Sequence, residues 1–144
     1  EINGFTQNVG GQPIRVEDSA VLSFRFASGA TGTHNTGYYL DHGKESEIRI
    51  WGSHGWLRLA HLEGQPLQWY STQPGAPRGV QTFKYNDTHE MYHLFFQEAI
   101  DAIREGTPPP ITTSESLRAL RVVFAAYEAV ATGKTQRLNV TETR

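Results

Sequence analysis

The segments SAVLSFRFASG, residues 19–29, and EIRIWGSHGWLRL, residues 47–59, decide the fold of this chain. Leu22, Phe24 and Phe26 alternate with polar residues in the first segment, as Ile48 and Ile50 do in the second, which is the period of a half-buried strand. A tight turn is predicted by Gly29 in the first segment and by Gly52 and Gly55 in the second. Residues 18–60 therefore predict four strands in an antiparallel meander with one apolar and one polar face.

Further strands are predicted around this meander. Ile14 and Val16 are expected to begin the sheet, in a polar lead-in at residues 1–17 that forms a short strand or is irregular. The other predicted strands are 65–71, 80–85 and 136–140.

Two helices are predicted in the second half of the chain, where the apolar period changes to that of a helix face. The first is expected at 88–105, ended by Gly106 and the prolines beyond it. The second begins after Thr112, has Glu115 at capping-box spacing, and ends at Gly133. The apolar stripes consist of Tyr92, Phe95, Phe96, Ala99 and Ile103 in the first helix, and of Leu117, Leu120, Phe124, Tyr127 and Ala131 in the second.

These elements predict an α+β fold, an open and mostly antiparallel sheet of about six strands with two main helices packed on one face. The face of Leu22, Phe24 and Phe26 is expected to receive the helical stripes. The opposite face, which carries Ser23 and Arg25, is too polar for a core. A subunit, a second domain or a ligand is expected to cover it.

Composition limits the function classes. The 144 residues include no cysteine, which excludes disulfides, thiol catalysis and cysteine zinc sites. A net charge of −2 without a basic stripe argues against nucleic acid and anionic membranes as partners. No apolar run has the length of a membrane span and no signal peptide is visible, so we expect a cytoplasmic protein. The length predicts a single domain, 1–144. A chain without an initiating Met is compatible with a processed or excised piece of a longer protein.

The sharpest formal motif is H-E-x-x-H, formed by His89, Glu90 and His93. On a helix, two histidines at this spacing bind zinc while the glutamate acts as general base, with Glu115 as a third ligand. Against a zinc hydrolase, the motif fixes only three positions, and Glu90 already fits a capping role. The prediction is therefore no metal site, with the zinc hydrolase kept as an alternative.

His34, Asn35, Tyr38 and Tyr39 form the densest cluster of hydrogen-bonding side chains. Neutral polar and aromatic groups of this kind suit a polyhydroxylated small molecule, because they supply donors, acceptors and rings for stacking. These four residues are the predicted substrate contacts. An exposed strand end with ordinary surface polarity explains them equally well.

Four segments in order resemble a known family. EDSAVLSFRFASGA, residues 17–30, resembles the E-D-x-A-x-x-x-x-x-F-x-x-G-A strand and turn of the glucose–fructose oxidoreductase/inositol dehydrogenase (Gfo/Idh/MocA) family. IRIWGSHGWL, residues 48–57, is similar to its I-x-I-x-G-x-x-G-x-L hairpin. Residues 95–109 resemble its F-x-x-A-I…G-x-x-P helix, and residues 116–134 its closing helix and S-A-x-T-G-K sequence.

The resemblance covers residues 15–140 and only the C-terminal domain of that family. It implies a substrate-binding and oligomerisation domain of an NAD(P)-dependent oxidoreductase that acts on a sugar, polyol or related molecule. The N-terminal Rossmann domain, which binds NAD or NADP, and the catalytic Lys and His are implied upstream of Glu1, so this chain alone has no catalytic or cofactor-binding residue. A homo-oligomer through the open sheet face is implied. The alternative is a stand-alone oligomerisation or binding module.

Overall fold

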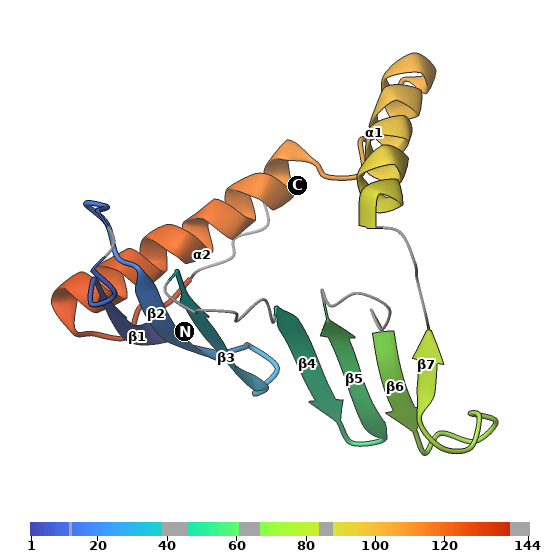
Figure 1. Cartoon of the computed structure of the whole chain (residues 1–144), viewed down its shortest axis with the longest axis horizontal. Coiled ribbons are helices and arrows are strands. Elements are labelled where there is room, and N and C mark those ends of the chain that lie inside the picture. Colours follow the sequence, from blue (N-terminus) through green and yellow to red (C-terminus); the bar gives the residue numbers. More distant parts are fainter. Residues whose placement is uncertain (12, 39–45, 61–66, 84–87, 139–144) are drawn as a thin grey trace. The chain divides into compact units, whose positions relative to one another are not determined.

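The computed structural model describes residues 1–11, 13–38, 46–60, 67–83 and 88–138, and the side chains of helix α1 from residue 92 onward. It confirms the α+β class, with seven antiparallel strands and two helices (Figure 1). The elements are β1 (Ile2–Gln7), β2 (Ser19–Arg25), β3 (Thr31–Gly37), β4 (Glu47–Gly52), β5 (Gly55–Ala60), β6 (Leu67–Ser71), β7 (Gln81–Phe83), α1 (Thr88–Glu105) and α2 (Thr113–Thr132).

The strands are divided between two sheets, whereas the sequence predicted one. Strands β1-β2-β3 form a three-stranded sheet and β4-β5-β6-β7 a four-stranded one. The chain accordingly forms two compact units, one of residues 1–41 and 111–144 and the other of residues 42–110. Both sheets consist of strands that are neighbours in sequence, and such local ladders form without any pairing of β3 with β4.

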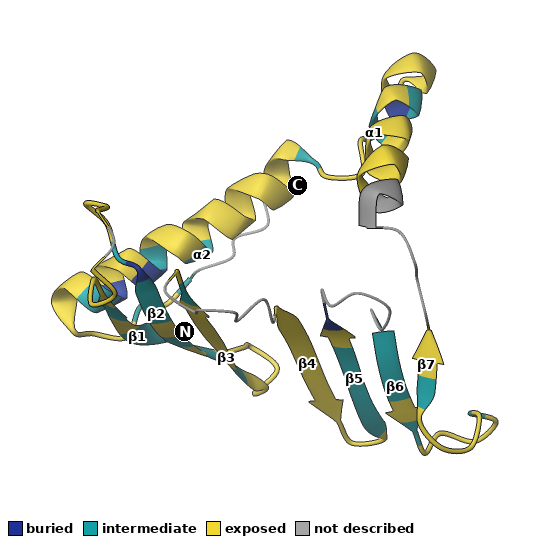
Figure 2. Ribbon diagram, in the orientation of Figure 1, coloured by how far each residue is buried: buried dark blue, intermediate teal, exposed yellow. Residues whose placement is uncertain are grey.

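The first unit is held together by contacts between α2 and β1 (Figure 1). Ile2 on β1 and Ala126 and Ala129 on α2 are buried (Figure 2). The chain returns to the sheet edge after α2, because Ile2 and Gln136 exchange two backbone hydrogen bonds of 2.9 Å. This bridge lies in the predicted strand 136–140, of which residues 139 and 140 are outside the described part.

The apolar stripe predicted for α2 is not the face that packs on the sheet. The better-buried positions recur at helical spacing in the second half of α2, where Ala126 and Ala129 are flanked by half-buried residues at 122, 125 and 130. Leu117, Leu120, Phe124, Tyr127 and Ala131 of the predicted stripe are exposed. Helix α2 is apolar on two sides, so periodicity alone did not identify the side that packs. That side carries small alanines, which allow α2 to lie close to β1.

The prediction that Ile14 and Val16 begin the sheet is wrong. Both side chains are exposed and lie in a loop, and β1 is formed instead by residues 2–7. The Asn8 side-chain amide donates hydrogen bonds to the carbonyl oxygens of Ile14 (3.0 Å) and Val16 (2.9 Å). These two carbonyl oxygens therefore accept hydrogen bonds within the loop and not from a neighbouring strand.

The second unit contains β4–β7 and α1. Gly55 begins β5 at φ 152°, and a Cβ atom there would lie 1.9 Å from the Tyr70 carbonyl oxygen on β6, so only glycine fits. Strand pairing separates the side chains into two faces. One face is apolar and carries Ile48, Ile50, Leu57, Leu59, Leu67 and Trp69. The other, which we call the aromatic–arginine face, carries Glu47, Arg49, Trp51, Trp56, Arg58, Gln68 and Tyr70.

The helix ends agree with the sequence. Helix α1 spans the predicted residues, and Gly106 follows it at φ 68°. At the start of α2, the Thr112 side chain accepts a hydrogen bond from the Glu115 amide, while the Glu115 carboxylate accepts one of 2.8 Å from the Thr112 amide. Gly133 ends α2 in the left-handed conformation.

Candidate functional site

The end of strand β3 carries the predicted substrate contacts, and the structure does not bring all of them together. Leu22 of β2 pairs with His34, and Val21 pairs with Asn35. Because successive side chains of a strand point to opposite faces, His34 shares a face with Leu22, and Asn35 shares the other with Val21. Both side chains are exposed. A ligand bound to one face of this sheet can therefore contact the side chain of His34 or that of Asn35, and not both.

Tyr38 follows directly after β3. Its backbone is fixed, since its amide donates a 2.8 Å hydrogen bond to the Asp18 carbonyl oxygen. Its side chain is 80% exposed and thus open to a ligand. Tyr39 lies outside the described residues.

Asp18, which positions Tyr38, is only 2% exposed. Its carboxylate accepts hydrogen bonds from the amides of Val9 (3.1 Å) and Gly10 (2.6 Å) and from the Ser19 hydroxyl (3.2 Å). Desolvation alone raises the pKa of this carboxyl, but the hydrogen bonds together outweigh it and hold the pKa below its ordinary value. The ionised Asp18 thus joins the loop after β1 to the start of β2 and, through its backbone, to Tyr38.

Glu17 makes a second connection next to Asp18. Its carboxylate accepts a 2.6 Å hydrogen bond from the Tyr127 hydroxyl of α2, which raises the pKa of Tyr127. Sequence reasoning assigned neither acid a role, although both belong to the E-D pair on which the family resemblance was based. Within the first unit, Glu17 and Asp18 thus connect the loop after β1, the start of β2 and helix α2.

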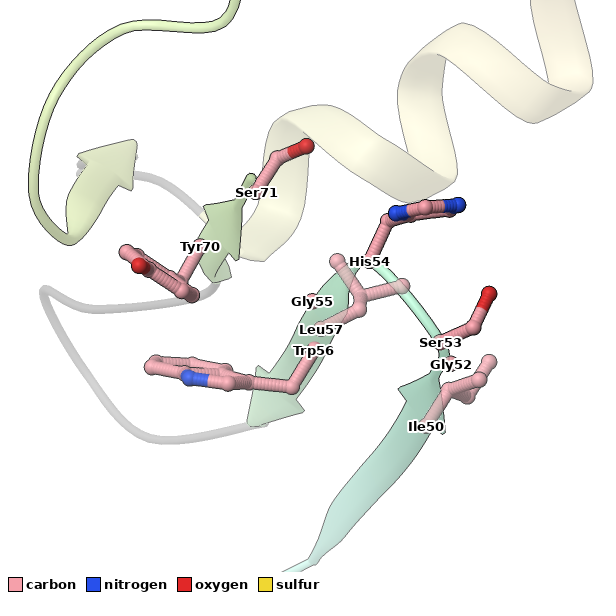
Figure 3. A pocket seen from close by; sticks show the side chains of 9 residues that line it. All are labelled: Ile50, Gly52, Ser53, His54, Gly55, Trp56, Leu57, Tyr70 and Ser71. Atoms are coloured by element: carbon pink, nitrogen blue, oxygen red, sulfur yellow. The ribbon is translucent and has the colours of Figure 1, made fainter. Parts of the chain in front are cut away.

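In the second unit, a shallow depression of about 360 Å³ lies beside the hairpin of β4 and β5 (Figure 3). The turn carries His54, whose carbonyl oxygen accepts hydrogen bonds from the Thr72 amide (2.7 Å) and hydroxyl (3.2 Å). Figure 3 shows Trp56 and Tyr70 side by side, pointing away from Leu57. The lining residues are Ile50, Gly52, Ser53, His54, Gly55, Trp56, Leu57, Tyr70 and Ser71.

A metal centre finds no support in the part of the chain that the structure describes. There, no group of three or more His, Asp or Glu residues is arranged to hold an ion. His93 is exposed on α1. The side chains of His89 and Glu90 lie outside the described ones, so the H-E-x-x-H motif itself is not tested.

Comparison with known proteins identifies the family. Residues 3–140 match the model of the Gfo/Idh/MocA "Oxidoreductase family, C-terminal alpha/beta domain". The chain belongs to this family. The match spans both units and includes the E-D pair, the β4–β5 hairpin and both helices.

Solved structures share the fold of this Gfo/Idh/MocA domain. Aldose-aldose oxidoreductase from Caulobacter crescentus, complexed with glycerol, has 23% identity and a TM-score of 0.73, with 95% of this chain and 40% of that one covered. An oxidoreductase from Agrobacterium radiobacter in complex with NAD+, L-tartaric acid and magnesium has 23% identity and a TM-score of 0.73 over 92% of this chain and 41% of that one. GenD2 from gentamicin A biosynthesis, in complex with NAD, has 19% identity and a TM-score of 0.74 over 96% of this chain and 41% of that one.

The chain thus spans about two fifths of the length of these structural relatives. No curated protein sequence matches it significantly. Neither α1 nor α2, the helices of the described residues, has both the length and the apolar content needed to cross a membrane.

Proposed function

We propose that this chain is the substrate-binding and oligomerisation domain of an NAD(P)-dependent oxidoreductase that acts on a sugar, polyol or related small molecule. The observation that carries the proposal is the family match over residues 3–140. Two structural relatives were solved with NAD, which supports nicotinamide chemistry for the whole protein. An aldose-aldose oxidoreductase complexed with glycerol supports a polyhydroxylated substrate.

Hydride transfer itself is assigned to another part of the whole protein. Residues 1–144 contain no glycine-rich loop that follows a strand and opens a helix, the sequence pattern that cradles a dinucleotide pyrophosphate. NAD or NADP and the catalytic residues are therefore proposed to belong to an N-terminal Rossmann domain. This chain contributes the surface that recognises the substrate.

The candidate substrate contacts are His34, Asn35, Tyr38 and Tyr39, and of His34 and Asn35 the one on the substrate side of β3 is proposed to bind. The exposed side chains of the first three offer an imidazole, an amide and a phenol for hydrogen bonds to hydroxyl groups. The anchoring of Tyr38 to Asp18 supports a preorganised contact at the strand end.

Alanine variants of His34 and Asn35 in the whole enzyme test this assignment. Because the two side chains lie on opposite faces, the variant on the substrate side should raise KM about five- to tenfold, the equivalent of one hydrogen bond, while the other changes KM less than twofold. Thr31→Ala, at the far end of β3, is the matched control and should leave KM unchanged. Unchanged KM in both His34→Ala and Asn35→Ala would refute β3 as a substrate contact.

We also propose that the domain assembles with copies of itself through an open sheet face. Large apolar and aromatic side chains remain exposed on the sheets, including Phe5, Val21 and Trp51. Exposed surface of this kind supports assembly. A stand-alone oligomerisation or binding module without enzymatic activity is an alternative, and it predicts that the whole protein binds neither NAD nor NADP.

A further inference from the structure

Strand β1 contains the single asparagine–glycine pair of the 144 residues, Asn3 followed by Gly4. In such a pair the backbone nitrogen of the second residue can attack the side-chain carbonyl carbon of the first, which closes a five-membered succinimide ring. Glycine in the second place favours the attack, because it has no side chain to hinder the approach. Whether the ring closes in a folded protein depends on how the strand holds these two groups.

The Gly4 amide points away from the ladder that joins β1 to β2. Glu1 and Arg25 exchange two backbone hydrogen bonds, of 2.8 and 3.0 Å. Hydrogen-bonded pairs alternate along an antiparallel ladder, so every second residue of β1, Gly4 among them, turns its amide to the outer edge. Gln136 bonds to β1 at the same edge. The Gly4 nitrogen is therefore not used in the pairing with β2.

The Asn3 carboxamide lies against this amide. Its Oδ1 accepts a hydrogen bond of 2.8 Å from the Gly4 nitrogen, and its Nδ2 donates one of 3.2 Å to the Thr135 hydroxyl after α2. The side-chain carbonyl carbon is one bond of about 1.2 Å from Oδ1, so the attacking nitrogen and the carbon under attack lie in near-attack contact. The hydrogen bond to Thr135 limits the freedom of the side chain to leave this position.

The sheet itself requires the glycine. A Cβ atom at residue 4 would overlap the carbonyl oxygen of Val21 and would lie 2.8 Å from the Leu22 side chain. A larger residue fits here only if β2 shifts. The packing of β1 on β2 therefore maintains the sequence that permits the attack.

Asn8 provides a contrast at the other end of β1. Its Nδ2 donates hydrogen bonds to the carbonyl oxygens of Ile14 (3.0 Å) and Val16 (2.9 Å). The next residue is the β-branched Val9, whose amide donates to the Asp18 carboxylate (3.1 Å). Both groups that would have to react are thus bound to other partners, and a branched side chain hinders the approach.

We propose that Asn3 is a site of spontaneous deamidation. Hydroxide takes the proton of the Gly4 nitrogen, this nitrogen bonds to the side-chain carbonyl carbon, and the bond from that carbon to Nδ2 breaks. Nδ2 leaves as ammonia with a proton from water, which restores the hydroxide. A water molecule then opens the succinimide at either carbonyl, which gives aspartate or isoaspartate at position 3.

Either product changes the edge of β1. A carboxylate cannot donate to Thr135 as the carboxamide does, and it adds a negative charge. Isoaspartate also lengthens the backbone by one carbon between residues 3 and 4, which disturbs the regular spacing of the ladder. Because β1 is the strand that contacts α2, the modified first unit should be less stable.

Peptide mapping of the folded full-length protein tests the site. Cleavage after glutamates releases residues 2–17, a peptide that contains both Asn3 and Asn8. After incubation, mass spectrometry should locate the exchange of NH2 for OH at Asn3, at a rate at least about tenfold that at Asn8. The rate should rise with pH, because hydroxide generates the attacking nitrogen. Isoaspartate is recognised by its resistance to an aspartate-specific endoprotease.

Asn3→Gln is the matched control, because its longer side chain would have to close a six-membered ring, which forms more slowly. The thermal midpoint of the incubated wild type should fall by about 2–4 °C, whereas that of Asn3→Gln treated in the same way should not change. A converted wild type with an unchanged midpoint would contradict the effect on β1.

An intact Asn3, under conditions in which the free peptide of residues 2–17 deamidates, would overturn the proposal. Equal rates at Asn3 and Asn8 would overturn it as well, because the structure distinguishes the two side chains. Both results leave the proposed oxidoreductase role untouched, since that role is measured by cofactor reduction and by KM.

Discussion

Among single residues, Glu17 and Asp18 just before β2 hold the first unit together although they lie in a loop. Asp18 is buried and accepts two backbone amides from the loop after β1, and Glu17 receives the Tyr127 hydroxyl. A carboxylate can accept several such bonds at once, whereas an amide side chain offers a single oxygen. The order of the first unit therefore depends on the ionised state of Asp18.

Asp18→Asn should lower the stability of the chain in a pH-dependent way. The pKa of Asp18 is below its ordinary value in the folded state, so its contribution to stability is present above the unfolded pKa of about 3.9 and is lost as the pH falls through the lower folded value. The difference in thermal midpoint between wild type and Asp18→Asn should thus be largest near neutral pH and shrink below about pH 4. Thermal melts followed by circular dichroism at several pH values measure it.

Asp101→Asn is the control, because that acid lies on α1 in an exposed pair with Arg104. It should change the midpoint little at any pH, as expected for a surface ion pair. If Asp18→Asn melts like the wild type from neutral to acidic pH, Asp18 does not hold the loop.

Two features of single residues could not be predicted from the sequence. His34 and Asn35 were grouped because they are adjacent in sequence, and the strand separates them because adjacency in a strand means opposite faces. The Asp18 carboxylate binds backbone amides of a loop eight to nine residues earlier in the chain. The periodicity of apolar residues does not predict a contact of this kind.

At the scale of elements, the helices were the most predictable parts. Their bounds follow from local signals, namely the apolar period, the Thr112–Glu115 capping box and the glycines at the ends. The face of α2 that packs on the sheet was not predictable. The helix is apolar on two sides, and the side that packs is the one with small alanine side chains. A short strand was allowed within residues 1–17, but its position at residues 2–7 was not predicted, because Ile14 and Val16 nearer to β2 carry the same apolar alternation.

Removal of the α2 cap should destabilise the first unit. Thr112→Ala deletes the side-chain oxygen that accepts the Glu115 amide, which is expected to cost about 1 kcal/mol of unfolding free energy. Urea denaturation followed by circular dichroism measures this loss. Thr113→Ala, one residue inside the helix and exposed, is the matched control and should stay within about 0.5 kcal/mol of the wild type. Equal stabilities of the two variants would show that the cap contributes nothing.

On the level of the whole molecule, the chain is a Gfo/Idh/MocA C-terminal domain with large aromatic side chains exposed on its strands. The α+β class was predictable because strand and helix periods are local, whereas the division into two sheets was not, because it depends on which strands pair. The chain spans about two fifths of the length of its structural relatives.

We propose that the protein to which these residues belong transfers hydride between a nicotinamide cofactor and a sugar, polyol or related small molecule. The most direct measurement is NADH or NADPH absorbance when the product of the entire open reading frame is mixed with NAD or NADP and a panel of aldoses and polyols. Reduced cofactor should form with at least one member of the panel, and none should form when residues 1–144 are assayed alone. A full-length protein that binds neither dinucleotide would contradict it.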